Sequence, residues 1–284
     1  NGVIQQISNS AIEHIYDIEV IDAKGKWLLP GLIDIHVNGG GGGMSIDGTT
    51  ESIEKIIKAH SENGTTGLLI TTISVEDGLL EKSISCISEV SKKRIAASKI
   101  LGIHLEGPFL NSEKRGAHQK QFLKKPNIDF FKNICKISNN TIKILSLAPE
   151  LENAFELIEY ASKIGVIPGL AHSEANYEIS MQAIAKGMIL CTHLFNGMIP
   201  FTHKEVGPVG AYLTTSDTFV EIISDGVHIV PPALEIIYKA KNKDKIILVT
   251  DAVTPAGTIL DSFEILNTKL EVRGNSCYIP NSNN

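Results

Sequence analysis

Cysteine is scarce in this sequence, with four residues among 284. They are widely spaced, and no two form the Cys-x-x-Cys pair that is common in metal-binding and redox motifs: Cys86, Cys135, Cys191 and Cys277. This spacing argues against a disulfide framework and favours reduced thiols, so we predict a cytoplasmic protein.

Long apolar runs are also absent. No segment approaches the roughly 18 consecutive apolar residues of a transmembrane helix, and no signal-like segment precedes the first predicted strand. The net charge of −6 argues against a surface for nucleic acid or anionic membranes. The sequence has neither a GxGxxG motif nor a P-loop. We therefore expect no nucleic acid or membrane partner, and nothing points to a nucleotide.

The two ends of the sequence lack the usual terminal signals. The chain begins without methionine, in a turn-like Asn-Gly-Val-Ile segment, and it finishes in a loop-like Pro-Asn-Ser-Asn-Asn segment. We expect a fragment or a truncated product of a longer chain.

Strand-like and helix-like segments alternate along most of the sequence. Apolar segments predict eight strands, at 28–36, 67–72, 101–106, 142–147, 166–172, 188–193, 219–224 and 246–251. Segments with helical spacing separate most of them, at 50–63, 78–97, 128–138, 151–164, 177–186 and 232–242. Such alternation predicts an α/β fold, a (β/α)8 TIM-type barrel, which we place at 27–257.

Both ends of the chain depart from this pattern. Residues 1–26 predict two or three short strands, and 258–284 alternate as strands where a barrel would have its eighth helix. We assign both segments to a small β domain. A run of five glycines at 39–43 predicts no regular element, and it indicates either a close approach to a ligand or a mobile loop.

Potential ligands and titratable groups follow six of the eight strands: His36, Glu106, His172, His193, His228 and Asp251. In TIM barrels, the chemistry is located at these carboxyl ends of the strands. One carboxylate and two histidines from three strands suit a catalytic zinc-like ion that keeps a position open for water, and our choice is Glu106, His172 and His193. Such an ion lowers the pKa of its water towards neutrality and so supplies a hydroxide nucleophile.

Two further groups complete this interpretation. Asp251 would act as general base towards the water and then as general acid towards a leaving amine. His104 shares a strand face with Glu106, and we interpret it as a core histidine and not as a ligand.

Seven short segments resemble the N-acetylglucosamine-6-phosphate deacetylases, a family of the amidohydrolase superfamily. They are PGLIDIHVNG at 30–39, GIHLEGPF at 102–109, LAPE at 147–150, AHS at 171–173, THLFNGM at 192–198, SDGVH at 224–228 and VTDA at 249–252. The resemblance runs from about residue 20 to the end of the chain. It implies a barrel with a small β-sandwich domain, incomplete here, and hydrolysis of N-acetylglucosamine 6-phosphate to glucosamine 6-phosphate and acetate.

The resemblance also implies roles for single residues. Glu106, His172 and His193 would hold the principal divalent ion, and Asp251 would be the acid/base. His118 matches a residue that contacts the sugar and helps to polarise the acetyl carbonyl. Phosphate or sugar contacts are implied for Asn196 and the backbone of Gly197, and a contact to substrate across a homodimer interface for His228.

Two positions depart from the family pattern. Many amidohydrolases carry His-x-His after the first strand, whereas this chain has His36-Val37-Asn38, so we expect one divalent ion, zinc. His36 is then either a ligand of a weakly bound second ion or a packed polar residue. Lys204 stands where the family usually has arginine, which keeps a cation for phosphate but removes the bidentate fork.

Two other functions remain open from the sequence. One is an amidohydrolase acting on another N-acyl sugar or on a cyclic amide. The other is a truncated, inactive homologue that only binds its ligand, which the absence of an eighth-helix signal favours.

Overall fold

The computed structural model describes residues 4–10, 19–93, 95, 97–266, 268–274, 276–278 and 280. By their contacts, the residues fall into two units, Asn1–Pro30 and Gly31–Asn284. In the first unit, the described residues 4–10 and 19–30 contain neither helix nor strand. The strands expected within 1–26 are therefore wrong for these residues, because all of them are exposed and a short strand needs a buried apolar face to be stable. The expectation for 11–18 lies outside the described residues.

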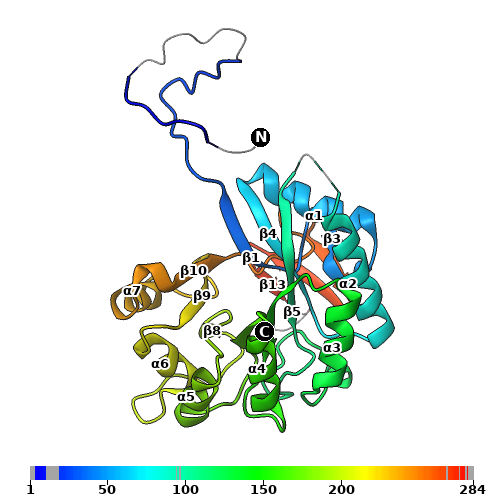
Figure 1. The fold of residues 1–284 in the computed structure, drawn as a ribbon, viewed down its shortest axis with the longest axis vertical. Coiled ribbons are helices and arrows are strands. Elements are labelled where there is room, and N and C mark those ends of the chain that lie inside the picture. Colours follow the sequence, from blue (N-terminus) through cyan, green and yellow to red (C-terminus); the bar gives the residue numbers. More distant parts are fainter. Residues whose placement is uncertain are drawn as a thin grey trace. The chain divides into compact units, whose positions relative to one another are not determined.

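Eight parallel strands form one sheet in which each strand pairs with its neighbour along the chain (Figure 1). They are β1 (Leu32–Val37), β4 (Thr65–Thr72), β5 (Lys99–Glu106), β6 (Ile142–Leu147), β7 (Ile167–Leu170), β8 (Leu190–Cys191), β9 (Phe219–Ile223) and β10 (Ile246–Val249). The two edge strands, β1 and β10, meet near their carboxyl ends, where the Asp251 N–H donates to the His36 carbonyl at 3.0 Å. The sheet thus nearly closes into the predicted barrel.

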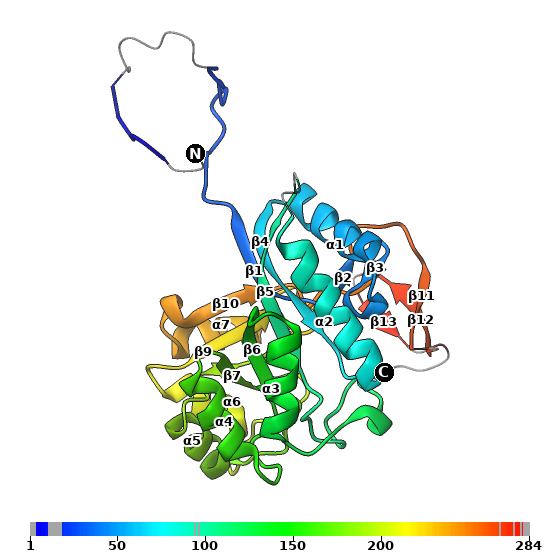
Figure 2. The same ribbon diagram turned by 45° about the vertical axis from the view of Figure 1, so that its right-hand side comes forward.

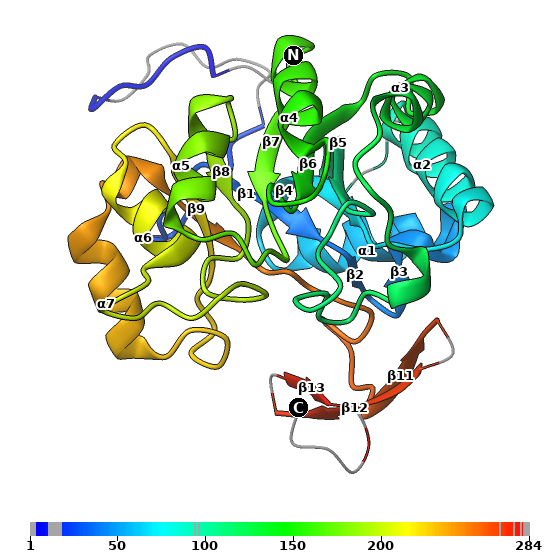
Figure 3. The same ribbon diagram turned by 90° about the horizontal axis from the view of Figure 1, so that it is seen from below.

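Helices lie around the outside of these strands (Figure 3). They are α1 (Thr50–Glu62), α2 (Asp77–Ser91), α3 (Ile128–Ile137), α4 (Ala154–Lys163), α5 (Tyr177–Ala185), α6 (Gly207–Thr214) and α7 (Pro231–Ala240). Three short 3-10 turns accompany them, η1 (Ser45–Asp47), η2 (Lys120–Phe122) and η3 (Lys243–Lys245). The amphipathic pattern does not predict α6, because Gly207 to Leu213 are all buried and the segment has no polar face.

The glycine run forms a small hairpin, so the expectation of no regular element there is wrong. Strands β2 (Gly39–Gly40) and β3 (Gly43–Met44) pair in antiparallel fashion. A Cβ atom on Gly39 would lie 2.7 Å from the Thr254 nitrogen, and one on Gly41 would lie 2.8 Å from the Lys55 carbonyl oxygen. Glycine therefore allows this hairpin to pack against α1 and against the segment after β10.

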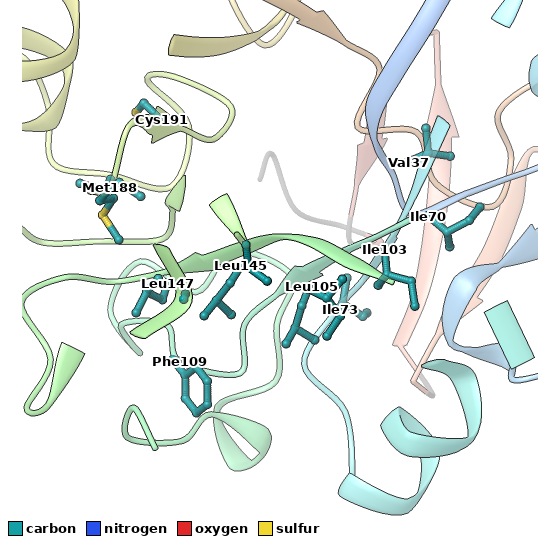
Figure 4. Close-up of a cluster of buried hydrophobic side chains, with 14 of the residues drawn as sticks. Val37, Ile70, Ile73, Ile103, Leu105, Phe109, Leu145, Leu147, Met188 and Cys191 are labelled. Atoms are coloured by element: carbon teal, nitrogen blue, oxygen red, sulfur yellow. The ribbon is translucent and has the colours of Figure 1, made fainter. Parts of the chain in front are cut away.

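Alternation along the strands separates the core from the site. Ile103 and Leu105 belong to the main cluster of buried apolar side chains, which Figure 4 shows together with Leu145 and Leu147. Full burial of each such side chain stabilises the fold by roughly 1.5–3 kcal/mol. Glu106 lies on the opposite face of the same strand, as the two-residue period requires.

A three-stranded antiparallel sheet follows the barrel (Figures 2 and 3). Its strands are β11 (Ser262–Ile265), β12 (Thr268–Arg273) and β13 (Ser276–Tyr278). No helix follows β10 in the described part of the chain, as expected, and Leu248 on β10 is 61% exposed. The domain boundaries at 26 and 258 remain predictions. None of the described helices has the length and apolar character that a membrane span requires.

Candidate metal centre

Glu106 is the last residue of β5 and is only 3% exposed. Its Oε1 atom lies 3.2 Å from Nε2 of His172 and 3.0 Å from Nε2 of His193. The two Nε2 atoms are 3.2 Å apart. The structure therefore brings together the three residues that the sequence predicts as ligands, from the ends of β5, β7 and β8.

The second ring nitrogen of each histidine determines what this cluster can bind. Nδ1 of His172 lies 2.7 Å from the carbonyl oxygen of Lys114, and Nδ1 of His193 lies 3.1 Å from that of Asn196. A carbonyl oxygen can only accept, so both Nδ1 atoms carry the proton and both neutral rings present a lone pair at Nε2. Three electron-pair donors then converge without a proton between them. This arrangement fits a divalent cation held by one carboxylate and two imidazoles.

The electrostatics of the cluster favour an ionised carboxylate. Burial opposes the charge of Glu106, but His36 and three further histidines outweigh it and hold the pKa of Glu106 well below its usual range. Burial lowers the pKa of His172. At His193, burial opposes the charge, but Glu106 and Asp251 together raise the pKa above its usual value. A proton on His193 would therefore compete with a bound cation.

His36 lies beside the predicted ligands and is completely buried. Its Nε2 atom is 3.1 Å from Oδ1 of Asp251 and 3.5 Å from Oε2 of Glu106, and its Nδ1 atom is 3.0 Å from Oε2 of Glu221. Burial disfavours its charge, but Asp251 and Glu106 together raise the pKa of His36 well above its usual value. His36 is thus paired with the site and is not an isolated polar residue in the core.

Asn38 replaces the second histidine of the His-x-His pattern with a hydrogen-bond donor. Its Nδ2 atom donates to Oδ1 of Asp251 at 2.7 Å. Burial opposes the charge of Asp251, but the facing His36 lowers its pKa overall, which keeps it a carboxylate. Asp251 is therefore oriented by Asn38 and remains able to accept a proton.

His118 enters the site from the loop after β5 and is buried. Its Nδ1 atom accepts the backbone N–H of Ser74 at 3.1 Å, so the proton of the neutral ring is on Nε2. That Nε2 atom lies 3.6 Å from Oε2 of Glu106. His118 thus offers a hydrogen-bond donor beside the three predicted ligands.

His104 has both ring nitrogens occupied. Nδ1 lies 3.1 Å from the Ile35 carbonyl oxygen, and Nε2 lies 2.6 Å from Oγ of Ser146. Burial lowers the pKa of His104 to about 4. These contacts agree with the interpretation of His104 as a core histidine.

A cavity of about 970 Å³ opens at this rim of the barrel. Its lining includes the three predicted ligands together with His118, Asn196, Gly197, Asp225, His228 and Asp251. His228 is exposed, and its Nδ1 atom lies 2.7 Å from Oδ2 of Asp225. Lys204 is also exposed but does not line the cavity, so the chain as described does not bring it to the other predicted binding residues.

The amidohydrolase family model matches residues 27–273, which is most of the chain. This chain belongs to the amidohydrolase family. It is 32% identical to the N-acetylglucosamine-6-phosphate deacetylase of Bacillus subtilis (strain 168), over 98% of this chain and 71% of that protein. It is 33% identical to the same-named protein of Haemophilus influenzae, over 99% of this chain and 73% of that one.

Solved structures give the same family. A mutant of the N-acetyl-D-glucosamine-6-phosphate deacetylase from Mycobacterium smegmatis, in complex with N-acetyl-D-glucosamine-6-phosphate, superposes with a TM-score of 0.85 at 28% identity. The match covers 89% of this chain and 66% of that one. This amidohydrolase chain therefore spans 66% of the solved relative and 71% of the Bacillus subtilis protein.

Sequence reasoning about this amidohydrolase missed Glu221. It lies within β9 and is completely buried, and its Oε2 atom accepts from the His193 N–H at 3.3 Å as well as facing His36. Its position in the apolar segment 219–224 was the available signal, because a carboxylate is costly to bury without a partner. Glu221 thereby connects β1 with the turn that carries His193.

The low pKa of His104 makes a prediction about stability. In the unfolded chain, His104 has a pKa of 6.5 and takes up a proton below that pH. In the folded chain, His104 stays neutral until about pH 4. The free energy of unfolding should therefore fall as the pH drops through this window, by about 3 kcal/mol from this residue. Urea unfolding of the wild type and of His104→Gln across this range tests it, with the exposed His203→Gln as control. Equal pH slopes for wild type and His104→Gln would contradict it.

Proposed function

We propose that this amidohydrolase hydrolyses the acetamide of N-acetylglucosamine 6-phosphate to glucosamine 6-phosphate and acetate. The proposal is carried by one observation: the Nε2 lone pairs of His172 and His193 and the Glu106 carboxylate converge on one point. Asp251 and His118 line the same cavity. The names of the relatives at 32% and 33% identity supply the substrate class.

We propose one divalent ion, zinc, held by Glu106, His172 and His193. When bound, it would lower the pKa of a water molecule and polarise the acetyl carbonyl. A weak second ion would be held near His36, but Asn38 supplies no second imidazole and instead donates to Asp251. This difference from the His-x-His pattern favours a single ion.

Asp251 and His118 would have different roles in the hydrolysis: Asp251 transfers a proton, and His118 donates a hydrogen bond. Asp251 accepts a proton as the water oxygen bonds to the acetyl carbon, and it returns that proton to the amide nitrogen as the C–N bond breaks. His118 donates its Nε2–H to the carbonyl oxygen, where negative charge develops. The fixed tautomer of His118 suits this role, because Ser74 occupies Nδ1.

Binding of the sugar phosphate is proposed for residues that line the cavity. Asn196, the backbone of Gly197, and His228 line it, whereas Lys204 would have to move or to act from a partner chain. We further propose a cytoplasmic homodimer in which His228 contacts the substrate of the partner chain. The exposure of His228 supports this arrangement.

Acetate release from N-acetylglucosamine 6-phosphate tests the proposal, with the unphosphorylated sugar as control. We expect kcat/KM to be roughly tenfold or more higher for the phosphorylated sugar, since a hydrogen bond to a charged group contributes about 1.5–3 kcal/mol. Activity on neither sugar, with metal bound, would contradict it. N-acetylgalactosamine 6-phosphate should be tested in the same series of substrates. The N-acetylgalactosamine-6-phosphate deacetylase of Escherichia coli O157:H7 is 28% identical to this chain.

Gly197→Ala should weaken binding of the ion. The φ angle of Gly197 is +63°, and a Cβ atom there would lie 2.7 Å from Nδ1 of His172. We expect a loss of ion affinity in the roughly 10–100-fold range that disturbed ligand orientation produces. Chelator competition measures it. Gly165→Ala is the matched control, because Gly165 has a φ angle of +79° and no atom within 4 Å of the added Cβ. Equal ion affinity in both variants would show that the contact with His172 is unimportant.

A further inference from the structure

Glu150 follows β6 and accepts hydrogen bonds from two other loops at the same rim. Its Oε1 atom accepts from Nδ2 of Asn111 at 2.9 Å and from the Glu174 N–H at 2.6 Å. Its Oε2 atom accepts the Ser173 hydroxyl at 2.6 Å. Asn111 belongs to the loop after β5, and Ser173 and Glu174 to the loop after β7. One half-buried carboxylate therefore connects the ends of three consecutive barrel strands.

Two of these partners of Glu150 also adjoin or contact His172. Ser173 is its immediate neighbour, and the Asn111 N–H donates to the His172 carbonyl at 2.9 Å. Asn111 also shapes the turn that presents the Lys114 carbonyl, because its Oδ1 atom accepts the Glu113 N–H at 2.9 Å. The Lys114 carbonyl in turn occupies Nδ1 of His172. Glu150 thus influences both the backbone of His172 and the partner that sets its tautomer.

His172 needs such support because its backbone is in the left-handed region, with a φ angle of +46°. L-residues rarely adopt this conformation unless their surroundings impose it. Its ring also lies in a narrow space, since a Cβ atom on Gly116 would be 3.1 Å from Cε1 of His172. A small rotation of the backbone would therefore turn Nε2 away from Glu106.

The hydrogen bonds of Glu150 differ from those of an ordinary surface ion pair. Among the described residues, no lysine, arginine or histidine forms an ion pair with its carboxylate, and its three partners are neutral donors. Glu152, two residues further on, instead pairs with Lys125 at 2.6 Å in the exposed region. A carboxylate that accepts three hydrogen bonds fixes the positions of its three donors, whereas a single exposed ion pair fixes little.

We propose that Glu150 is a positioning residue that holds the ligand His172 in its strained conformation, acting through Ser173 and Asn111. This inference rests on the proposed metal centre. It assigns a role in metal affinity to a residue that does not line the cavity.

Zinc affinity measured by chelator competition tests the proposal, in wild type, Glu150→Ala, Glu150→Gln and the control Glu152→Gln. We expect Glu150→Ala to bind zinc about 10–100-fold more weakly, as is typical when a partner of a ligand is removed. Glu150→Gln should keep most of the wild-type affinity. The glutamine oxygen can accept from Asn111 and from the Glu174 N–H, and the glutamine NH2 group can donate to Oγ of Ser173. Glu152→Gln should match the wild type. With Co²⁺ in place of zinc, the visible absorption of Glu150→Ala should change, since the geometry of a ligand changes.

Each other result has a defined meaning. Wild-type affinity and an unchanged Co²⁺ spectrum in Glu150→Ala would overturn the proposal, even if that variant melted at a lower temperature, because the role would then be only structural. If Glu150→Ala does not fold, Ser173→Ala replaces it in the experiment, because it removes the hydroxyl that donates to Glu150 beside His172. Ser173→Ala should then bind zinc more weakly than the wild type. Wild-type affinity in Ser173→Ala would overturn the proposal. A wild type that takes up no ion would instead refute the metal centre itself.

Discussion

Asp251→Asn should reduce kcat for acetate release by about 10²–10⁴-fold, the usual contribution of a general acid–base group. Asparagine has the shape of aspartate, and its Oδ1 atom can still accept from Asn38, which donates to Asp251 at 2.7 Å. It cannot take a proton from water or return one to the leaving amine. The loss should therefore appear in kcat and leave the site intact.

Ion content distinguishes this role of Asp251 from a role as ligand. Asp251 is outside the cluster of Glu106, His172 and His193, so the variant should keep its ion in stoichiometric amount. Elemental analysis of the purified variant, beside the acetate assay, measures both quantities. Full activity in Asp251→Asn would rule out Asp251 as the base, and loss of the ion would make it a ligand.

Glu106→Gln should remove the ion and with it the activity. The Glu106 carboxylate is the only anion of the three-ligand cluster, and both Nε2 atoms lie within 3.2 Å of its Oε1. An amide oxygen carries no charge, so we expect a loss of affinity beyond the roughly 10–100-fold that removal of an outer partner causes. Chelator competition and acetate release measure the two effects.

Glu113→Gln is the matched control for this experiment. Glu113 lies in the loop after β5, is exposed, and has a loose ion pair with Lys120 at 3.9 Å. Such a pair contributes little, so this variant should bind the ion as the wild type does. Retention of a stoichiometric ion by Glu106→Gln under competition would show that the ion is held elsewhere.

Local sequence patterns predict most of the barrel because its elements are periodic. Strand β6 has the expected bounds of 142–147, and α3 ends one residue before the expected 138. Helix α6 is missing from the prediction because its apolar sequence forms a helix only where both faces are buried. The glycine hairpin is missing for a related reason, since its pairing depends on contacts with α1 and Thr254.

The sequence by itself predicts Glu106, His172 and His193 as a ligand set, because the carboxyl ends of barrel strands must share one rim and one carboxylate with two histidines suits a divalent ion. Only the tertiary structure decided how each side chain is held. It fixed the tautomers of His172, His193 and His118 through carbonyl and N–H groups that are distant in sequence. It also joined His36 to the site and placed Glu150 between three loops. Such contacts depend on distance and direction in space, and the order of residues does not encode them in any local pattern.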